Sequence, residues 1–69
     1  MNRDDAIYIT EHYRASERQN GFNPTLVDMV RQAEWIVFHT PHTTSPDTRG
    51  KFRMIGRAAE YLLRNMPDA

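Results

Sequence analysis

Apolar residues recur three and four positions apart in three segments of the chain, and polar residues occupy most of the positions between them. In the first segment, Ala6, Ile9 and Tyr13 share one face at this spacing. A period near 3.6 residues is typical of an amphipathic helix with one buried face. The pattern therefore predicts an all-α fold and a single domain over residues 1–69. The three predicted helices span about residues 4–19, 24–38 and 46–65.

The ends of these segments carry residues that favour helix starts and stops. Asp4 places negative charge at the start of the first segment, and Gly21 follows its end. Asn23 is the predicted cap of the second helix, with Pro24 in its first position, where the missing N–H costs nothing. Ser45 is the predicted cap of the third helix.

Two local features qualify this picture. The run Ile-Tyr-Ile-Thr at residues 7–10 is rich in strand-forming side chains, so a short strand stays open as an alternative there. Phe22 and Val27 stand at the spacing of a hydrophobic staple around the second helix start, which favours a helix entering from the loop at residues 20–23.

More apolar surface is present than a chain of 69 residues can be expected to hide. Trp35 and Phe38 extend the apolar face of the second helix around its final turn. The third helix carries an a/d seam over two heptads, a spacing that is typical of helix–helix contacts. The seam consists of Phe52, Ile55, Ala59, Leu62 and Met66. We therefore expect a homo-oligomeric helical bundle whose interface contains Trp35, Phe38, Phe52, Ile55, Ala59 and Leu62.

Charge is balanced overall but uneven along the chain. Nine basic and nine acidic residues give a formal net charge of zero. Residues 1–47 hold four arginines against seven carboxylates, and residues 48–69 hold five basic residues against two acidic ones. The zero net charge and the long connection at 39–45 disfavour a DNA-binding helix-turn-helix. The halves either attract each other, within or between copies, or the basic half serves as an anion site.

Motifs that indicate catalysis or a cofactor are missing from the sequence. It has no glycine-rich phosphate loop and no nucleophile elbow, so we expect a protein that is not an enzyme and has no cofactor. His39 and His42 have no third ligand at a familiar spacing, so no metal site is predicted. Neither a signal peptide nor an apolar run long enough for a membrane span is present, and cysteine is absent. These features favour a cytoplasmic protein with no membrane partner.

A basic stripe is the strongest candidate for binding. Arg49, Arg53, Arg57 and Arg64 fall at i, i+4, i+8 and i+15, near one face of the third helix, and Lys51 lies close by. The planar guanidinium fork suits phosphate and carboxylate. The predicted ligand-binding residues are Arg49, Lys51, Arg53, Arg57 and His42.

From His42 onward the sequence has a histidine, a loop, the basic–aromatic pair at 51–52, Ile55, two alanines at 58–59, and Leu62. This stretch of about a third of the chain, up to Leu63, resembles the first half of the helical-hairpin family of phage cyclic-nucleotide sponges that counter CBASS immunity. The resemblance implies a phage-encoded helical oligomer that sequesters a cyclic oligonucleotide without chemistry. The alternative is a small inhibitor or adaptor that blocks a host protein through the apolar turn at 35–38 or the arginine stripe.

Overall fold

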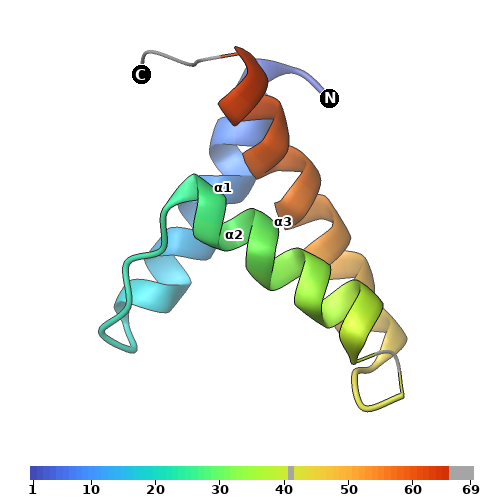
Figure 1. Ribbon diagram of the computed structural model, residues 1–69. Helices are drawn as coiled ribbons and strands as arrows, with labels where there is room; N and C mark the ends of the chain where they lie inside the picture. Colours follow the sequence, from blue (N-terminus) through green and yellow to red (C-terminus); the bar gives the residue numbers. More distant parts are fainter. Residues whose placement is uncertain (41, 66–69) are drawn as a thin grey trace.

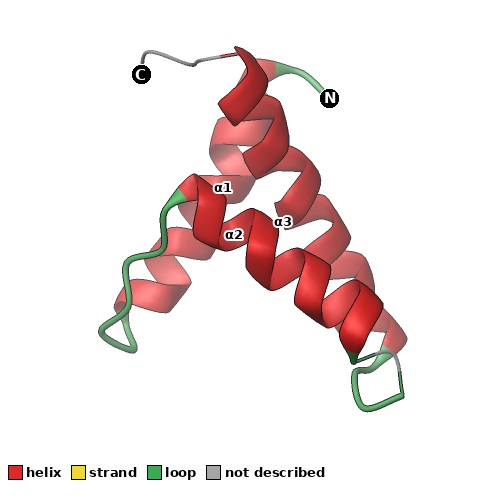
Figure 2. Ribbon diagram, viewed as in Figure 1, coloured by secondary structure: helices red, strands yellow, loops and turns green. Residues whose placement is uncertain are grey.

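Helices joined by two loops make up the fold in a computed structural model, which describes residues 1–40 and 42–65 (Figure 1). The helices are α1 (Arg3–Arg18), α2 (Leu26–Glu34) with a π-helical turn η1 (Trp35–His39) that continues it, and α3 (Pro46–Asn65). The described residues contain no strand (Figure 2), so the all-α prediction is confirmed. The strand alternative at residues 7–10 is wrong, because these residues lie inside α1. Met66 of the predicted seam lies outside the described residues.

Capping residues at the first and third helices agree with the sequence pattern. The Asn2 side chain accepts a hydrogen bond from the Asp5 backbone N–H at 2.8 Å, and Ser45 Oγ accepts one from the Thr48 N–H at 3.2 Å. Gly21 has φ of +79°, in the left-handed region that glycine adopts without a steric penalty. Its N–H donates to the Arg18 carbonyl, which closes the end of α1.

The second helix begins two residues later than predicted. Its cap is Thr25, whose hydroxyl accepts from the Asp28 N–H while the Asp28 carboxylate accepts from the Thr25 N–H. This reciprocal capping box satisfies two backbone donors that Asn23 alone would leave without partners. The carbonyl of Pro24 accepts from Arg14 Nε at 3.1 Å, so the predicted first helical residue instead ties the loop to α1. The staple is also wrong, because Phe22 and Val27 are both largely exposed.

A core of small and medium-sized side chains forms where α3 packs against both α1 and α2. Tyr13 of α1, Met29 of α2, and Ile55 and Ala59 of α3 make one buried cluster. The Tyr13 and Phe52 rings meet edge to face, with centroids 5.7 Å apart. A second buried cluster joins Ala6 of α1 to Ala58 and Leu62 of α3. No helix of the described chain is long and apolar enough to cross a bilayer.

The closest approach of α2 and α3 depends on Gly56. A β-carbon placed on this residue would stand 2.7 Å from the Ala33 β-carbon, well inside the contact distance of two carbon atoms. The missing side chain of Gly56 thus permits the close approach of two helices of the same chain. The small residues Ala58 and Ala59 are fully buried on the same helix.

Candidate binding surfaces

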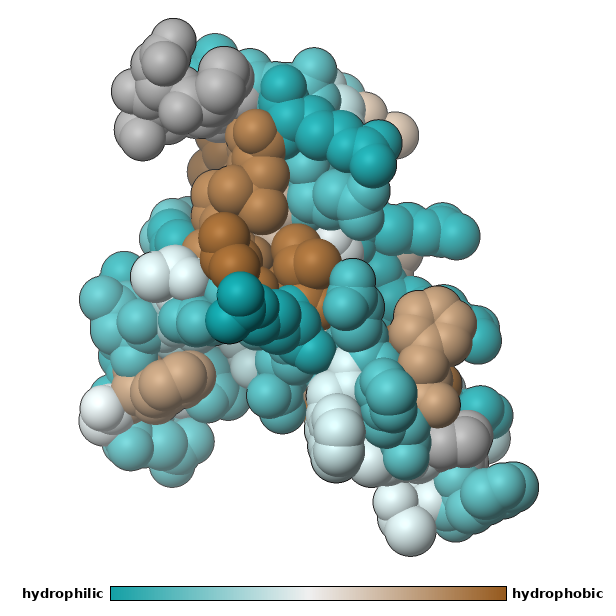
Figure 3. All heavy atoms as spheres, viewed as in Figure 1, coloured by the Kyte–Doolittle hydropathy of each residue, from teal (hydrophilic) through white to brown (hydrophobic). Residues whose placement is uncertain are grey.

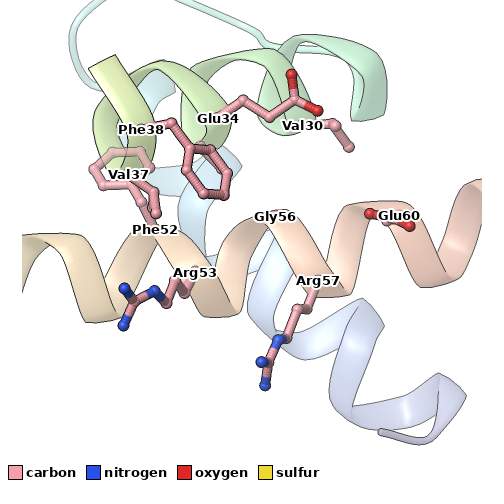
Figure 4. Close-up of a pocket in the computed structure, with 10 residues that line it drawn as sticks. Val30, Glu34, Val37, Phe38, Phe52, Arg53, Gly56, Arg57 and Glu60 are labelled. Atoms are coloured by element: carbon pink, nitrogen blue, oxygen red, sulfur yellow. The ribbon is translucent and has the colours of Figure 1, made fainter. Parts of the chain in front are cut away.

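A groove with a volume of about 290 Å³ lies between α2 and α3 (Figure 4). Ala33 and Gly56 lie at its floor, where the helices come closest. Its apolar wall residues are Val30, Val37, Phe38 and Phe52, and its charged residues are Glu34, Arg53, Arg57 and Glu60. The groove therefore combines an apolar floor with a charged rim.

Arg53 and Arg57 are the groove's basic residues. Figure 4 shows both side chains extending from successive turns of α3 to the side that faces away from α2. In the described part of the chain, the ion pairs are Glu11–Arg14 at 3.3 Å and Glu60–Arg64, each within a single helix. Arg53 and Arg57 thus have no carboxylate at ion-pair distance among these residues, whereas Glu60 has its charge compensated.

The predicted ligand set is divided by the fold. Arg53 and Arg57 line the groove, but Lys51 lines a different hollow, between α1 and α3. His42 lies exposed in the α2–α3 loop. Arg49 is half-buried, and its Nε is buried with no hydrogen-bond partner in the described chain. A single site with all five predicted residues is therefore not formed within this chain, because Lys51 projects from another side of α3.

The apolar turn at the end of α2 leaves two large aromatic side chains exposed. Trp35 is 57% exposed and Phe38 is 73% exposed. A π-helical turn points its side chains in all directions, and the chain covers only Ile36 and Val37 in part. Phe38 lines the groove, whereas Trp35 stacks on His39 with ring centroids 5.0 Å apart. Both residues are thus exposed in the single chain, and their role in an interface stays a prediction.

The other half of the predicted interface has a different role. Ile55 is 3% exposed, Leu62 is 5% exposed, and Ala59 is fully buried, all within a single chain. Their seam packs α3 against α1 and α2, which removes them from the predicted contact between copies. Phe52, half-buried against Tyr13, also serves this core.

Exposed apolar side chains extend the groove past its Glu60 end. Figure 3 shows apolar atoms gathered over the start of α2 and the second half of α3. Val27 and Leu63 are large apolar residues that remain 44% and 39% exposed on these elements. Val27 and Glu34 are seven residues apart, so they lie on the same face of α2. The apolar stripe follows α2 and η1, whose 14 residues span roughly 20 Å at the helical rise.

The pKa values of Asp28 and Tyr13 are shifted by contacts that stabilise the fold. Hydrogen bonds from the Thr25 backbone and side chain lower the pKa of Asp28. Burial raises the pKa of Tyr13, and the nearby Glu17 carboxylate adds to this effect. Asp28 acts in helix capping, and Tyr13 acts in core packing. Groups of three or more potential metal ligands are not found among the described residues.

Comparison of the chain with protein-family models, with curated proteins and with solved structures gives no match. The resemblance to cyclic-nucleotide sponges therefore stays a prediction, and function is argued from the geometry of the surface.

Sequence reasoning identified Phe38, Arg53 and Arg57 separately but not the groove that joins them. The only signal for it was Gly56, whose missing side chain deepens the groove floor. Local periodicity does not determine which helix packs against Gly56.

Proposed function

We propose that this protein is a non-catalytic binding protein that holds an acidic, amphipathic helix of another protein in the groove between α2 and α3. The observation that carries the proposal is the exposure of Phe38 on a groove that Arg53 and Arg57 also line, since these arginines have no carboxylate partner in the described chain. Burial of Phe38 by a partner would remove apolar surface from water, which is the main driving force of protein association.

The dimensions and charge of the groove support a helical partner. Helix-in-groove recognition places an apolar face in a cleft, with anchors spaced over several turns. The stripe of roughly 20 Å along α2 and η1 matches about 14 helical residues. Since Glu60 is paired with Arg64, the rim presents two arginines against Glu34, which favours acidic residues on the partner. Phenylalanine and arginine are also enriched at protein interfaces.

A photo-crosslinking amino acid at position 38 tests this proposal in the cells that produce the protein. The expected result is an adduct with one protein, which disappears when Arg53 and Arg57 are replaced by glutamate. The matched control carries the crosslinker at position 22, because Phe22 is also an exposed aromatic residue but lies in the α1–α2 loop. Equal labelling from both positions, or an adduct of only two copies of the chain, would refute the proposal.

A second candidate function is sequestration of a phosphate-bearing ligand, as the sequence resemblance implies. It is favoured by the pair of exposed arginines one turn apart, since two guanidinium groups at this spacing suit a phosphate. The volume of about 290 Å³ is at the small end of the range for ligand pockets, so a whole cyclic oligonucleotide would extend beyond the groove.

Calorimetric titration with cyclic di- and trinucleotides separates the two candidates. If phosphate binds here, Arg53→Ala and Arg57→Ala each weaken binding by about tenfold or more, since a charge-assisted contact is worth roughly 1.5–3 kcal/mol. The Lys51→Ala control should leave the affinity unchanged, because Lys51 lines another hollow. No binding tighter than about 100 μM, or ~5.5 kcal/mol, would rule out the phosphate ligand.

A further inference from the structure

A second exposed surface follows the line where α1 packs on α3; it shares Arg57 with the groove but contains neither Phe38 nor Arg53. Two hollows of about 440 and 290 Å³ lie along it, and both are lined by Tyr8, Ile9 and Met54. Tyr8 is 71% exposed and Met54 is 48% exposed. The Tyr8 ring stacks on His12 with centroids 6.0 Å apart, which makes a flat aromatic platform on α1. We call this surface the α1–α3 seam.

Charge is arranged along the seam in a simple order. Asp5 and Arg57 line the first hollow, and His12 and Lys51 line the second. The α1 side therefore presents an acidic residue at one end, and the α3 side presents a basic residue at each end. Asp5 and Arg57 both line the first hollow, together with Met1, and do not form an ion pair with each other among the described residues. Their charges are therefore left for a partner.

We propose that the α1–α3 seam binds a second copy of this chain, in a two-fold dimer whose axis lies along the seam. Rotation about this axis places α1 of one copy over α3 of the other. Two symmetric contacts then form, each between Asp5 of one copy and Arg57 of the other. Tyr8 of each copy packs on Met54 of the other copy in the centre. A two-fold interface must be self-complementary in this way.

Charge selects this arrangement over the other two-fold packing of the same face. An axis across the seam would place Lys51 opposite Arg57, and two like charges at an interface are unfavourable. The uneven charge of the sequence supports the same conclusion. The acidic first half and the basic second half form no ion pair with each other within the described residues, where both pairs lie inside single helices. The attraction between the halves is thus available between copies.

Charge reversal tests the dimer by analytical ultracentrifugation, with the full chain at concentrations from about 1 μM to about 1 mM. Asp5→Arg and Arg57→Glu are each expected to weaken dimerisation by at least about tenfold, because each change alters two symmetric contacts. The double variant Asp5→Arg/Arg57→Glu exchanges the charges and is expected to restore the dimer.

Two matched controls separate this contact from other effects of charge. Asp4→Arg removes the same first-turn carboxylate charge from α1 but lies outside both hollows, and Arg53→Glu reverses an arginine that lines the groove but neither hollow. Neither is expected to change dimerisation, and Phe38→Ser, which removes the groove anchor, is also expected to leave the dimer intact. This last result distinguishes the seam from the proposed partner groove.

Several outcomes would overturn the proposal. A wild-type chain that stays monomeric over the whole concentration range would do so. A stronger dimer from Arg57→Glu would show that Arg57 faces a basic residue, as in the rejected packing. A double variant that remains monomeric would show that Asp5 and Arg57 do not meet. If circular dichroism shows that Asp5→Arg is unfolded, the test uses Arg57→Glu and Tyr8→Ala instead. Each of these variants is expected to weaken the dimer.

Discussion

Replacement of Gly56 by alanine tests the closest contact in the fold. The new β-carbon would stand 2.7 Å from the Ala33 β-carbon, whereas carbon atoms pack best at roughly 3.5–4.0 Å. The two helices must therefore separate by about 1 Å, which loosens the buried contacts of Met29 and Ile55.

The magnitude follows from two opposing effects. Alanine is favoured over glycine inside a helix by about 1 kcal/mol, and overpacking of a close-packed core costs roughly 1–3 kcal/mol. The overpacking cost is the larger, because the atom it meets is a β-carbon on a helix backbone that cannot rotate away. We expect Gly56→Ala to lower the free energy of unfolding by about 1 kcal/mol, which corresponds to roughly 4–8 °C in melting temperature for a chain of this size.

Gly50 provides a matched control in the same helix. No heavy atom lies within 4 Å of a β-carbon placed there, so Gly50→Ala is expected to stabilise the chain by about 1 kcal/mol. The double variant Ala33→Gly/Gly56→Ala removes the clash while the helix propensities cancel. It is expected to be more stable than the sum of the two single changes predicts.

Thermal unfolding followed by circular dichroism measures the wild type and the four variants, Ala33→Gly among them. If Gly56→Ala and Gly50→Ala stabilise the chain equally, α2 and α3 do not approach closely at Gly56, and the groove floor does not have the described structure. Additive effects of the changes at positions 33 and 56 would lead to the same conclusion.

Four further predictions concern capping, the core and metals. Thr25→Ala should lower the free energy of unfolding by about 1 kcal/mol in chemical denaturation, because the cap of α2 is lost, and no loss would contradict the capping box. Asp28→Ala should destabilise the chain at neutral pH, and its difference from wild type should narrow below about pH 4. The reason is that the pKa of Asp28 is lowered in the folded state, so its contribution is present above the ordinary carboxyl pKa and is lost as pH falls through the folded value. The control Asp4→Ala removes a first-turn carboxylate that makes no capping hydrogen bond in the described structure, so it should cost less at neutral pH than Asp28→Ala. Met29→Ala, which empties a fully buried site, should cost about 2–5 kcal/mol in the same denaturation experiment, and a smaller loss would place Met29 outside the core. A chelator should leave the melting temperature unchanged, since no metal site is predicted, and a loss that zinc restores would refute this.

Local features of the sequence were enough to predict the helices. Ala6, Ile9 and Tyr13 lie at helical spacing, and the structure buries Ala6 and Tyr13 and covers Ile9 in part. Ser45 caps α3 as predicted, because a hydroxyl at this position satisfies a backbone donor whatever the rest of the chain does. The start of α2 was predicted two residues early, because Asn23 and Thr25 are both good caps. Contacts outside the helix decided between them: Arg14 of α1 holds the Pro24 carbonyl in the loop.

Only the tertiary structure decided which apolar and basic residues meet. Periodicity placed Ile55, Ala59 and Leu62 on one face, but it cannot tell a seam within a chain from one between chains, since both bury the same side chains in the same way. The arginine pattern likewise grouped Lys51 with Arg53 and Arg57. In the structure α1 and α2 pack on different sides of α3, and Lys51 lies on the α1 side. A helix's own sequence sets the angle of each side chain around its axis. What lies opposite that side chain is set by packing between helices, and here that packing depends on the missing side chain of Gly56.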